Sequence, residues 1–149
     1  MRFLDESLFL HLSKVELLKD YLAEKKQELD RLNADLQGDL SHPVNGRRLT
    51  NLGTFRAYVN AYVRNIPKIH KDMTILVRQL PATPTGIPLE IYAFSRDTTW
   101  AVYEGITADI FDHLFAVITE FGLRVFQNPS GTDVDRALRE KRVEGLLSS

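Results

Sequence analysis

The sequence contains no cysteine, and this absence removes several classes of chemistry at once. Disulfide scaffolds, thiol nucleophiles and thiolate zinc sites all require cysteine, so none of them is open to this chain. No run of apolar residues approaches the roughly 18 that a membrane-spanning helix needs. Asp5 and Glu6 stand where a secretory signal peptide would carry its apolar core, which excludes a signal peptide of the usual form. We therefore expect a soluble chain.

The sequence also lacks the common catalytic and phosphate-binding motifs. No serine lies in a G-x-S-x-G or S-x-x-K pattern, and neither G-x-x-x-x-G-K nor G-x-G-x-x-G occurs. Asp109 and His113 stand four residues apart on one predicted helix, a spacing that could bring a carboxylate and an imidazole to one metal ion. The helical wheel puts both on the flank of the apolar face, so we interpret them as a pair that stabilises the helix. We predict no catalytic residue, no cofactor and no metal site; an enzyme that uses Asp109 and His113 is an alternative.

The 149 residues have an apolar fraction of 44%, enough for the core of one domain, and an uneven distribution of charge. Residues 44–80 hold seven bases and one acid, whereas residues 81–127 hold six acids and two bases. Arg56, Arg64 and Lys68 follow the polar side of a predicted helix and form a candidate electrostatic surface. We interpret it as a solvated helix face, with a charge-complementary subunit contact as the first alternative. Nucleic acid is disfavoured as a partner because the net charge of the chain is −1.

Residues 1–43 are predicted to form a helical segment. Apolar residues, mostly leucine, recur there at spacings of three, four and seven, which is typical of an amphipathic helix. Asp5 is a suitable N-cap, and Ser13 begins an S-x-x-E capping box. We expect either one long helix or a short helix over residues 6–12 followed by a longer one over residues 15–36. The segment either packs on its own domain or pairs with another chain.

Residues 44–131 are predicted to form an α+β domain. Apolar and β-branched residues favour strands in four short segments, and apolar residues recur at helical spacing in two longer ones. The order is that of the ferredoxin-like βαββαβ sandwich, an antiparallel sheet with two helices on one face. Residues 132–149 are expected to form a short helix or a disordered tail. The predicted strands cover residues 48–52, 73–80, 89–94 and 123–127, and the predicted helices cover 55–66, capped by Thr54, and 99–121, followed by Gly122.

The second predicted helix also carries apolar residues outside the face that a sheet would cover. Phe111, Phe115 and Ile118 form a stripe displaced by about 80–140° from the centre of the core face. Exposed aromatic patches commonly mark contacts with other molecules. We therefore expect either that the N-terminal helix covers this stripe or that the stripe forms a subunit or domain interface.

Several long stretches of the sequence resemble a known family. They include RRLTNLGTFRAY at residues 47–58, PLEIYAF at 88–94, ADIFDHLF at 108–115 and EFGLRVF at 120–126. The family is that of the small-conductance mechanosensitive channels, the MscS superfamily, and within it the YbdG-like miniconductance branch. The resemblance extends from about residue 2 to residue 131, which is nearly the whole chain.

This resemblance implies the C-terminal cytoplasmic part of such a channel, at the cytoplasmic face of the bacterial inner membrane. Members form homoheptamers whose cytoplasmic domains enclose a hollow cage, and ions and solutes permeate when membrane tension opens the channel. The membrane helices and most of the small β domain of the family have no counterpart here, so this chain would conduct no ions by itself. The resemblance brings no catalytic residue. A stand-alone ferredoxin-like module that binds a small ligand or RNA is the alternative.

Overall fold

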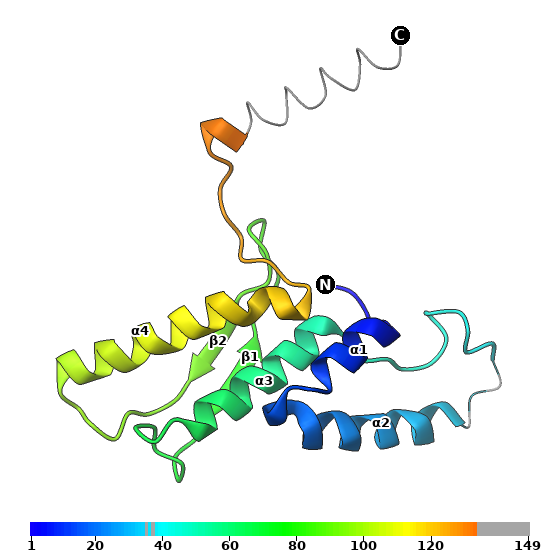
Figure 1. Ribbon diagram of the computed structural model, residues 1–149, viewed down its shortest axis with the longest axis horizontal. Coiled ribbons are helices and arrows are strands. Elements are labelled where there is room, and N and C mark those ends of the chain that lie inside the picture. The colour runs from blue at the N-terminus through cyan, green and yellow to red at the C-terminus, as the bar shows by residue number, and fades with distance from the viewer. Residues whose placement is uncertain (35, 37, 134–149) are drawn as a thin grey trace.

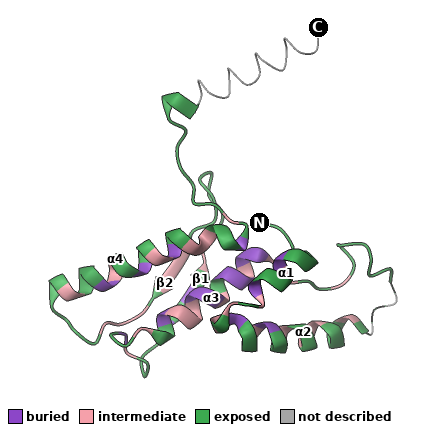
Figure 2. Cartoon of the chain, in the orientation of Figure 1, coloured by how far each residue is buried: buried purple, intermediate pink, exposed green. Residues whose placement is uncertain are grey.

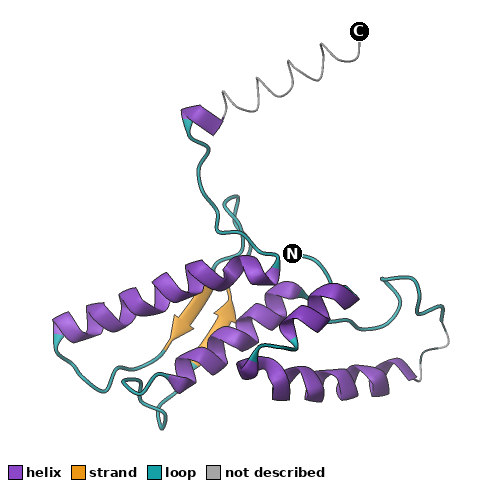
Figure 3. Cartoon of the chain, in the orientation of Figure 1, coloured by secondary structure: helices purple, strands orange, loops and turns teal. Residues whose placement is uncertain are grey.

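The computed structural model of the chain describes residues 1–34, 36 and 38–133. These residues form an α+β structure in which helices pack with a two-stranded antiparallel sheet (Figure 1). Helices dominate, and the sheet is a short hairpin between two of them (Figure 3). The predicted α+β class is therefore confirmed, but within the described residues the sheet has two strands where four were expected.

The N-terminal segment forms two α-helices separated by a 3-10 turn. They are α1 (Glu6–Leu12), η1 (Glu16–Leu18) and α2 (Lys19–Ala34). The Asp5 carboxylate accepts a hydrogen bond from the Leu8 N–H at 2.8 Å, which confirms Asp5 as the N-cap of a separate short helix. The predicted capping box is wrong, because the Ser13 hydroxyl instead donates to the Phe9 carbonyl oxygen at 2.8 Å and so closes α1.

Helix α3 (Asn51–Asn65) begins earlier than predicted, and its N-cap is Thr50 instead of Thr54. The Thr50 side chain accepts a hydrogen bond from the third helical N–H at 3.1 Å, while Thr54 is buried inside the helix. The strand predicted over residues 48–52 is therefore wrong. The helix takes its last two residues, and Thr50 retains one isolated bridge, to Phe3.

The sheet is a hairpin of β1 (Leu76–Gln79) and β2 (Leu89–Tyr92), which confirms the predicted central pair of strands. In its register Val77 lies opposite Ile91, and both pack in the hydrophobic core. Because side chains alternate along a strand, the pairs on either side of this one point to the other face. That face is partly open to solvent, and Tyr92 on it is exposed.

Helix α4 (Trp100–Val117) and the 3-10 helix η2 (Ile118–Phe121) form the second predicted helical region of the α+β domain. Gly122 ends it in the left-handed conformation, with φ 62°, which the absence of a Cβ atom makes accessible. The strand predicted over residues 123–127 is wrong: the strand beside which it would pair, the first of the four, is not formed. The prediction for residues 132–149 falls almost entirely outside the described residues.

The hydrophobic core joins the N-terminal segment to the rest of the chain. The ring centre of Phe121 lies 5.0 Å from that of Phe55 and 5.3 Å from that of Tyr58. Leu12 and Leu18 of the N-terminal segment are fully buried in the same cluster. Buried residues gather on α1 and α3, whereas the outer sides of α2 and α4 are exposed (Figure 2). In the part of the chain that the structure describes, no helix combines the length and apolar character needed to cross a membrane.

Candidate functional site

Two of the three interface residues predicted from the sequence lie exposed on α4. Phe111 is 47% exposed and Phe115 is 55% exposed, and the centres of their rings are 5.8 Å apart. Ile118, the third, is half-buried at the start of η2 and packs against the core. The N-terminal helices do not cover this stripe, because they pack beside α3 (Figure 1).

Further apolar residues extend this surface along the solvent side of α4. Trp100, at the first position of the helix, is 75% exposed. The opposite side of the same helix is buried through Ile106, Ile110 and Leu114. The solvent side therefore carries exposed aromatic residues in addition to the acids Glu104, Asp109 and Asp112. We call the solvent side the α4 face, and its exposed apolar residues are Trp100, Ala101, Ala108, Phe111 and Phe115.

A groove of about 830 Å³ lies beside the α4 face. Phe111 and Phe115 line it together with the end of the hairpin, residues 83–89. Val125 and Phe126 line it as well, and Phe126 is 50% exposed. The segment that was predicted as a last strand therefore adds apolar surface next to the α4 face.

The basic residues singled out from the sequence lie on and just beyond α3. Arg56 donates to the Gln79 side-chain oxygen at 3.3 Å, and Arg64 donates to the Asn60 side-chain oxygen at 2.8 Å. Lys68 is exposed in the loop after the helix, outside the groove that the two arginines line. The structure thus brings Arg56 and Arg64 together along one groove and leaves Lys68 apart.

Sequence reasoning missed two residues of this groove, because they come from another helix. Tyr21 and Lys25 of α2 line it together with Arg56 and Arg64 of α3, and the groove measures about 500 Å³. Burial raises the pKa of the Tyr21 phenol, and the nearby charges of Lys25 and Arg56 lower it in part. Tyr21 and Lys25 are one helical turn apart and share a face, but nothing local indicates that this face lies over α3.

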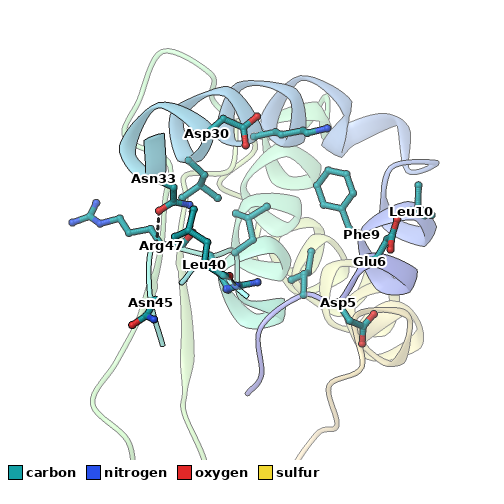
Figure 4. Close-up of a pocket in the computed structure, with 14 residues that line it drawn as sticks. Asp5, Glu6, Phe9, Leu10, Asp30, Asn33, Leu40, Asn45 and Arg47 are labelled. Atoms are coloured by element: carbon teal, nitrogen blue, oxygen red, sulfur yellow. Dashed lines mark hydrogen bonds between the residues drawn. The ribbon is translucent and has the colours of Figure 1, made fainter. Parts of the chain in front are cut away.

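A pocket of about 460 Å³ lies where the loop before α3 meets α1 and α2 (Figure 4). Half of its polar side chains are engaged within the protein. The Asn33 side chain accepts from the Arg47 N–H at 2.8 Å and donates to the Arg47 carbonyl oxygen at 3.0 Å, while Asp5 caps α1 and Arg48 binds the Leu40 carbonyl oxygen. We interpret this pocket as a packing seam that holds the loop against the helices.

His113 is engaged with aromatic residues of α3. Its Nε2 atom lies 2.7 Å from the Tyr58 hydroxyl, and its ring stacks on Tyr62 at 4.1 Å between centres. Burial raises the pKa of the Tyr62 phenol, and the Asp109 carboxylate adds to that rise. Among the described residues no three His, Cys, Asp or Glu side chains are grouped to hold a metal ion.

No protein-family model matches the chain, and no solved structure matches it. Its function is therefore argued from the residues and the surfaces described above.

Proposed function

We propose that the chain is the cytoplasmic domain of a mechanosensitive ion channel of the small-conductance family, where it contributes to the cage, to assembly and to the modulation of gating. The resemblance of residues 2–131 to that family supports the proposal and implies a location at the cytoplasmic face of the bacterial inner membrane. The partners are copies of the same chain, seven in the full-length channel, and the ions and solutes that permeate. No catalytic step and no cofactor enter this proposal.

The observation that carries the proposal is the α4 face. A surface helix normally turns a polar side to water, whereas α4 exposes Trp100, Phe111 and Phe115. Phe111 and Phe115 form an exposed aromatic pair, and Trp100 lies about three helical turns away. Exposed aromatic side chains of this kind are typical of a protein contact. A domain whose partners are its own copies needs such a surface, and the adjoining groove provides a concave place for side chains of a neighbour.

The proposal includes the finer ferredoxin-like arrangement of the sheet. The succession of α3, the hairpin and α4 is the order that this motif requires. Residues 123–127 are rich in strand-forming side chains, and their backbone groups make no hydrogen bonds among those of the described residues. These residues form no strand in the present structure, and their backbone donors and acceptors are left to pair as an edge strand in the assembled channel.

The test begins with the genomic reading frame that encodes this chain. A frame that also encodes several apolar spans of about 20 residues would support the proposal, and patch-clamp recording should then find a conductance opened by membrane tension. In that channel Phe115→Asp should abolish the assembly that carries the conductance, whereas Gln27→Asp on the exposed side of α2 should not. A frame without such spans would refute the channel proposal.

A further inference from the structure

The groove between α2, α3 and β1 has the composition of an anion site. Its floor on α3 consists of the small residues Gly53, Ala57 and Ala61, one helical turn apart, which leave room close to the helix backbone. Its rim carries Lys25, Arg56 and Arg64, and none of the described residues that line it bears a carboxylate. A groove with small residues below and cations above suits an anion that lies along the helix.

The two arginines retain most of their hydrogen-bonding capacity. Arg56 donates one hydrogen bond to the Gln79 side chain, and Arg64 donates to the Asn60 side chain and to the Ile75 carbonyl oxygen. All of these acceptors are uncharged. Within the described residues neither arginine forms an ion pair, although five other ion pairs occur there. A guanidinium with several free donors binds phosphate oxygens in two-point geometry.

The opposite wall adds a lysine, whose charge is balanced by a neighbouring carboxylate, and a neutral donor. Lys25 is ion-paired to Glu28 and is half-buried at the edge of the groove. The Tyr21 hydroxyl makes no hydrogen bond to another described residue, and burial keeps its pKa above the ordinary value, so it carries its proton at neutral pH. Tyr21, Lys25 and Arg56 therefore form one polar end of the groove, and Asn60 and Arg64 form the other.

We propose that this groove binds a phosphate-bearing molecule with two anionic groups, one at each polar end. The Arg64 guanidinium is held at the Ile75 carbonyl oxygen and the Arg56 guanidinium at the Gln79 side chain. These acceptors are four residues apart along extended chain, roughly 13 Å, so a single inorganic anion cannot reach both. A chain of linked phosphates or a phosphate ester with a second anionic group has the necessary length. This site lies apart from the α4 face and does not depend on the channel proposal.

Binding is tested by titrating the ¹⁵N-labelled chain with sodium tripolyphosphate and following its amide resonances. We expect saturable shifts confined to the residues of α2 and α3 that line the groove. Sodium sulfate at the same ionic strength should produce much smaller changes, because it carries only one anionic group. Shifts spread over all basic surfaces, or no saturation, would overturn the proposal.

Variants identify the groups that bind. Arg56→Gln and Arg64→Gln should each weaken tripolyphosphate binding at least about tenfold, since each removes a charge-assisted contact. Tyr21→Phe should weaken it less. Arg124→Gln is the matched control, because it removes an exposed arginine that lies outside this groove, and it should bind as the parent chain does. An equal loss in Arg124→Gln, or full binding in Arg56→Gln and Arg64→Gln variants of unchanged circular dichroism, would refute the site.

A second experiment distinguishes two sources of the phosphate, a lipid headgroup and a free solute. Sedimentation with vesicles of phosphatidylcholine, with or without phosphatidylglycerol, tests a lipid headgroup, while tripolyphosphate tests a free solute. Binding to the anionic vesicles that Arg56→Gln and Arg64→Gln reduce would assign the phosphate to a lipid. Binding of neither probe would overturn the proposal. So would an effect of these two variants on self-association alone, because the groove would then hold the acidic surface of a second copy.

Discussion

Helices α2 and α4 lie on different sides of α3, and each turns one side inward and one outward (Figure 1). Their inward sides are alike: Leu22 of α2 and Leu114 of α4 are both buried in the common core. Their outward sides differ. That of α2 is mostly charged or polar, whereas that of α4 is largely aromatic and small and carries acids as its charges. The exposed polar residues of α2 are Lys19, Asp20, Glu24, Lys26, Gln27, Asp30 and Arg31.

The contrast between the outer sides of α2 and α4 shows that burial inside the domain does not account for all apolar residues of α4. The charged outer side of α2 is favourably hydrated, so this helix needs no further packing partner. The aromatic rings of the α4 face are not favourably hydrated. Covering them would stabilise a complex in proportion to the apolar area removed from water. We therefore interpret α2 as a helix that covers the core on one side only. We interpret the outer side of α4 as a surface that contacts a second molecule.

The largest effect is expected on the inward sides, where the two helices should behave alike. Leu22 is 3% exposed and Leu114 is 6% exposed. Leu22→Ala and Leu114→Ala should each lower the free energy of unfolding by about 2–5 kcal/mol, because each leaves a cavity in the core. Urea unfolding followed by circular dichroism measures this. A cost below about 1 kcal/mol at Leu114 would contradict the packing of α4 on the core.

On the outward sides the two helices should differ in self-association. Phe115→Asp introduces a charge into the apolar α4 face, whereas Gln27→Asp introduces the same charge on the polar side of α2. We expect weak, concentration-dependent self-association of the parent chain, and Phe115→Asp should weaken it by about 30-fold, or ~2 kcal/mol. Gln27→Asp should leave it unchanged. Sedimentation equilibrium decides, and equal behaviour of the two variants would contradict the assignment of the α4 face.

A smaller effect is expected where α4 meets α3. Tyr58→Phe removes the hydroxyl that lies 2.7 Å from the Nε2 atom of His113, so the free energy of unfolding should fall by about 1 kcal/mol. Tyr62→Phe is the control, because Tyr62 stacks on the same imidazole without a hydrogen bond from its hydroxyl to a described residue. Its cost should be a few tenths of a kcal/mol. Equal costs in the two variants would show that the Tyr58 hydroxyl contributes nothing.

The smallest effect concerns the start of α4 and depends on pH. The Asp97 carboxylate accepts a hydrogen bond from the Thr99 N–H at 2.8 Å, and the hydrogen bonds from Thr99 hold its pKa below the ordinary value of 3.8. Because the folded-state pKa is the lower one, this contribution is present above pH 3.8 and is lost as the pH falls through the folded-state pKa.

Chemical shifts of the Thr99 amide, followed from pH 6 to about pH 2, measure this local change. In the parent chain the amide should report the protonation of Asp97. In Asp97→Asn that titration should disappear, while global stability at neutral pH changes little. A Thr99 amide that titrates identically in both chains would exclude Asp97 as its partner.

Local patterns were sufficient to predict that the helices and the hairpin exist and to predict two caps, but the Ser13 capping box and the Thr54 cap were wrong. The caps Asp5 and Gly122 depend on residues within one or two turns, so the sequence predicts them. The break between α1 and α2 was one of two alternatives that the sequence left open.

The start of α3 was not predictable in this way. Asn51 accepts a hydrogen bond from the Arg2 N–H at 2.9 Å and donates to the Phe121 carbonyl oxygen at 3.2 Å. These contacts span 49 and 70 residues, and they place a helix start where a strand was predicted.

The sequence by itself determined that Phe111 and Phe115 lie off the core side of α4, because a helix turns by a fixed angle at each residue. Only the tertiary structure decided that they remain uncovered, since the N-terminal helices pack beside α3. The same packing brought Tyr21 and Lys25 of α2 into one groove with the arginines of α3. Helical periodicity fixes which side chains share a face, but the burial of distant residues in a common core fixes which faces meet.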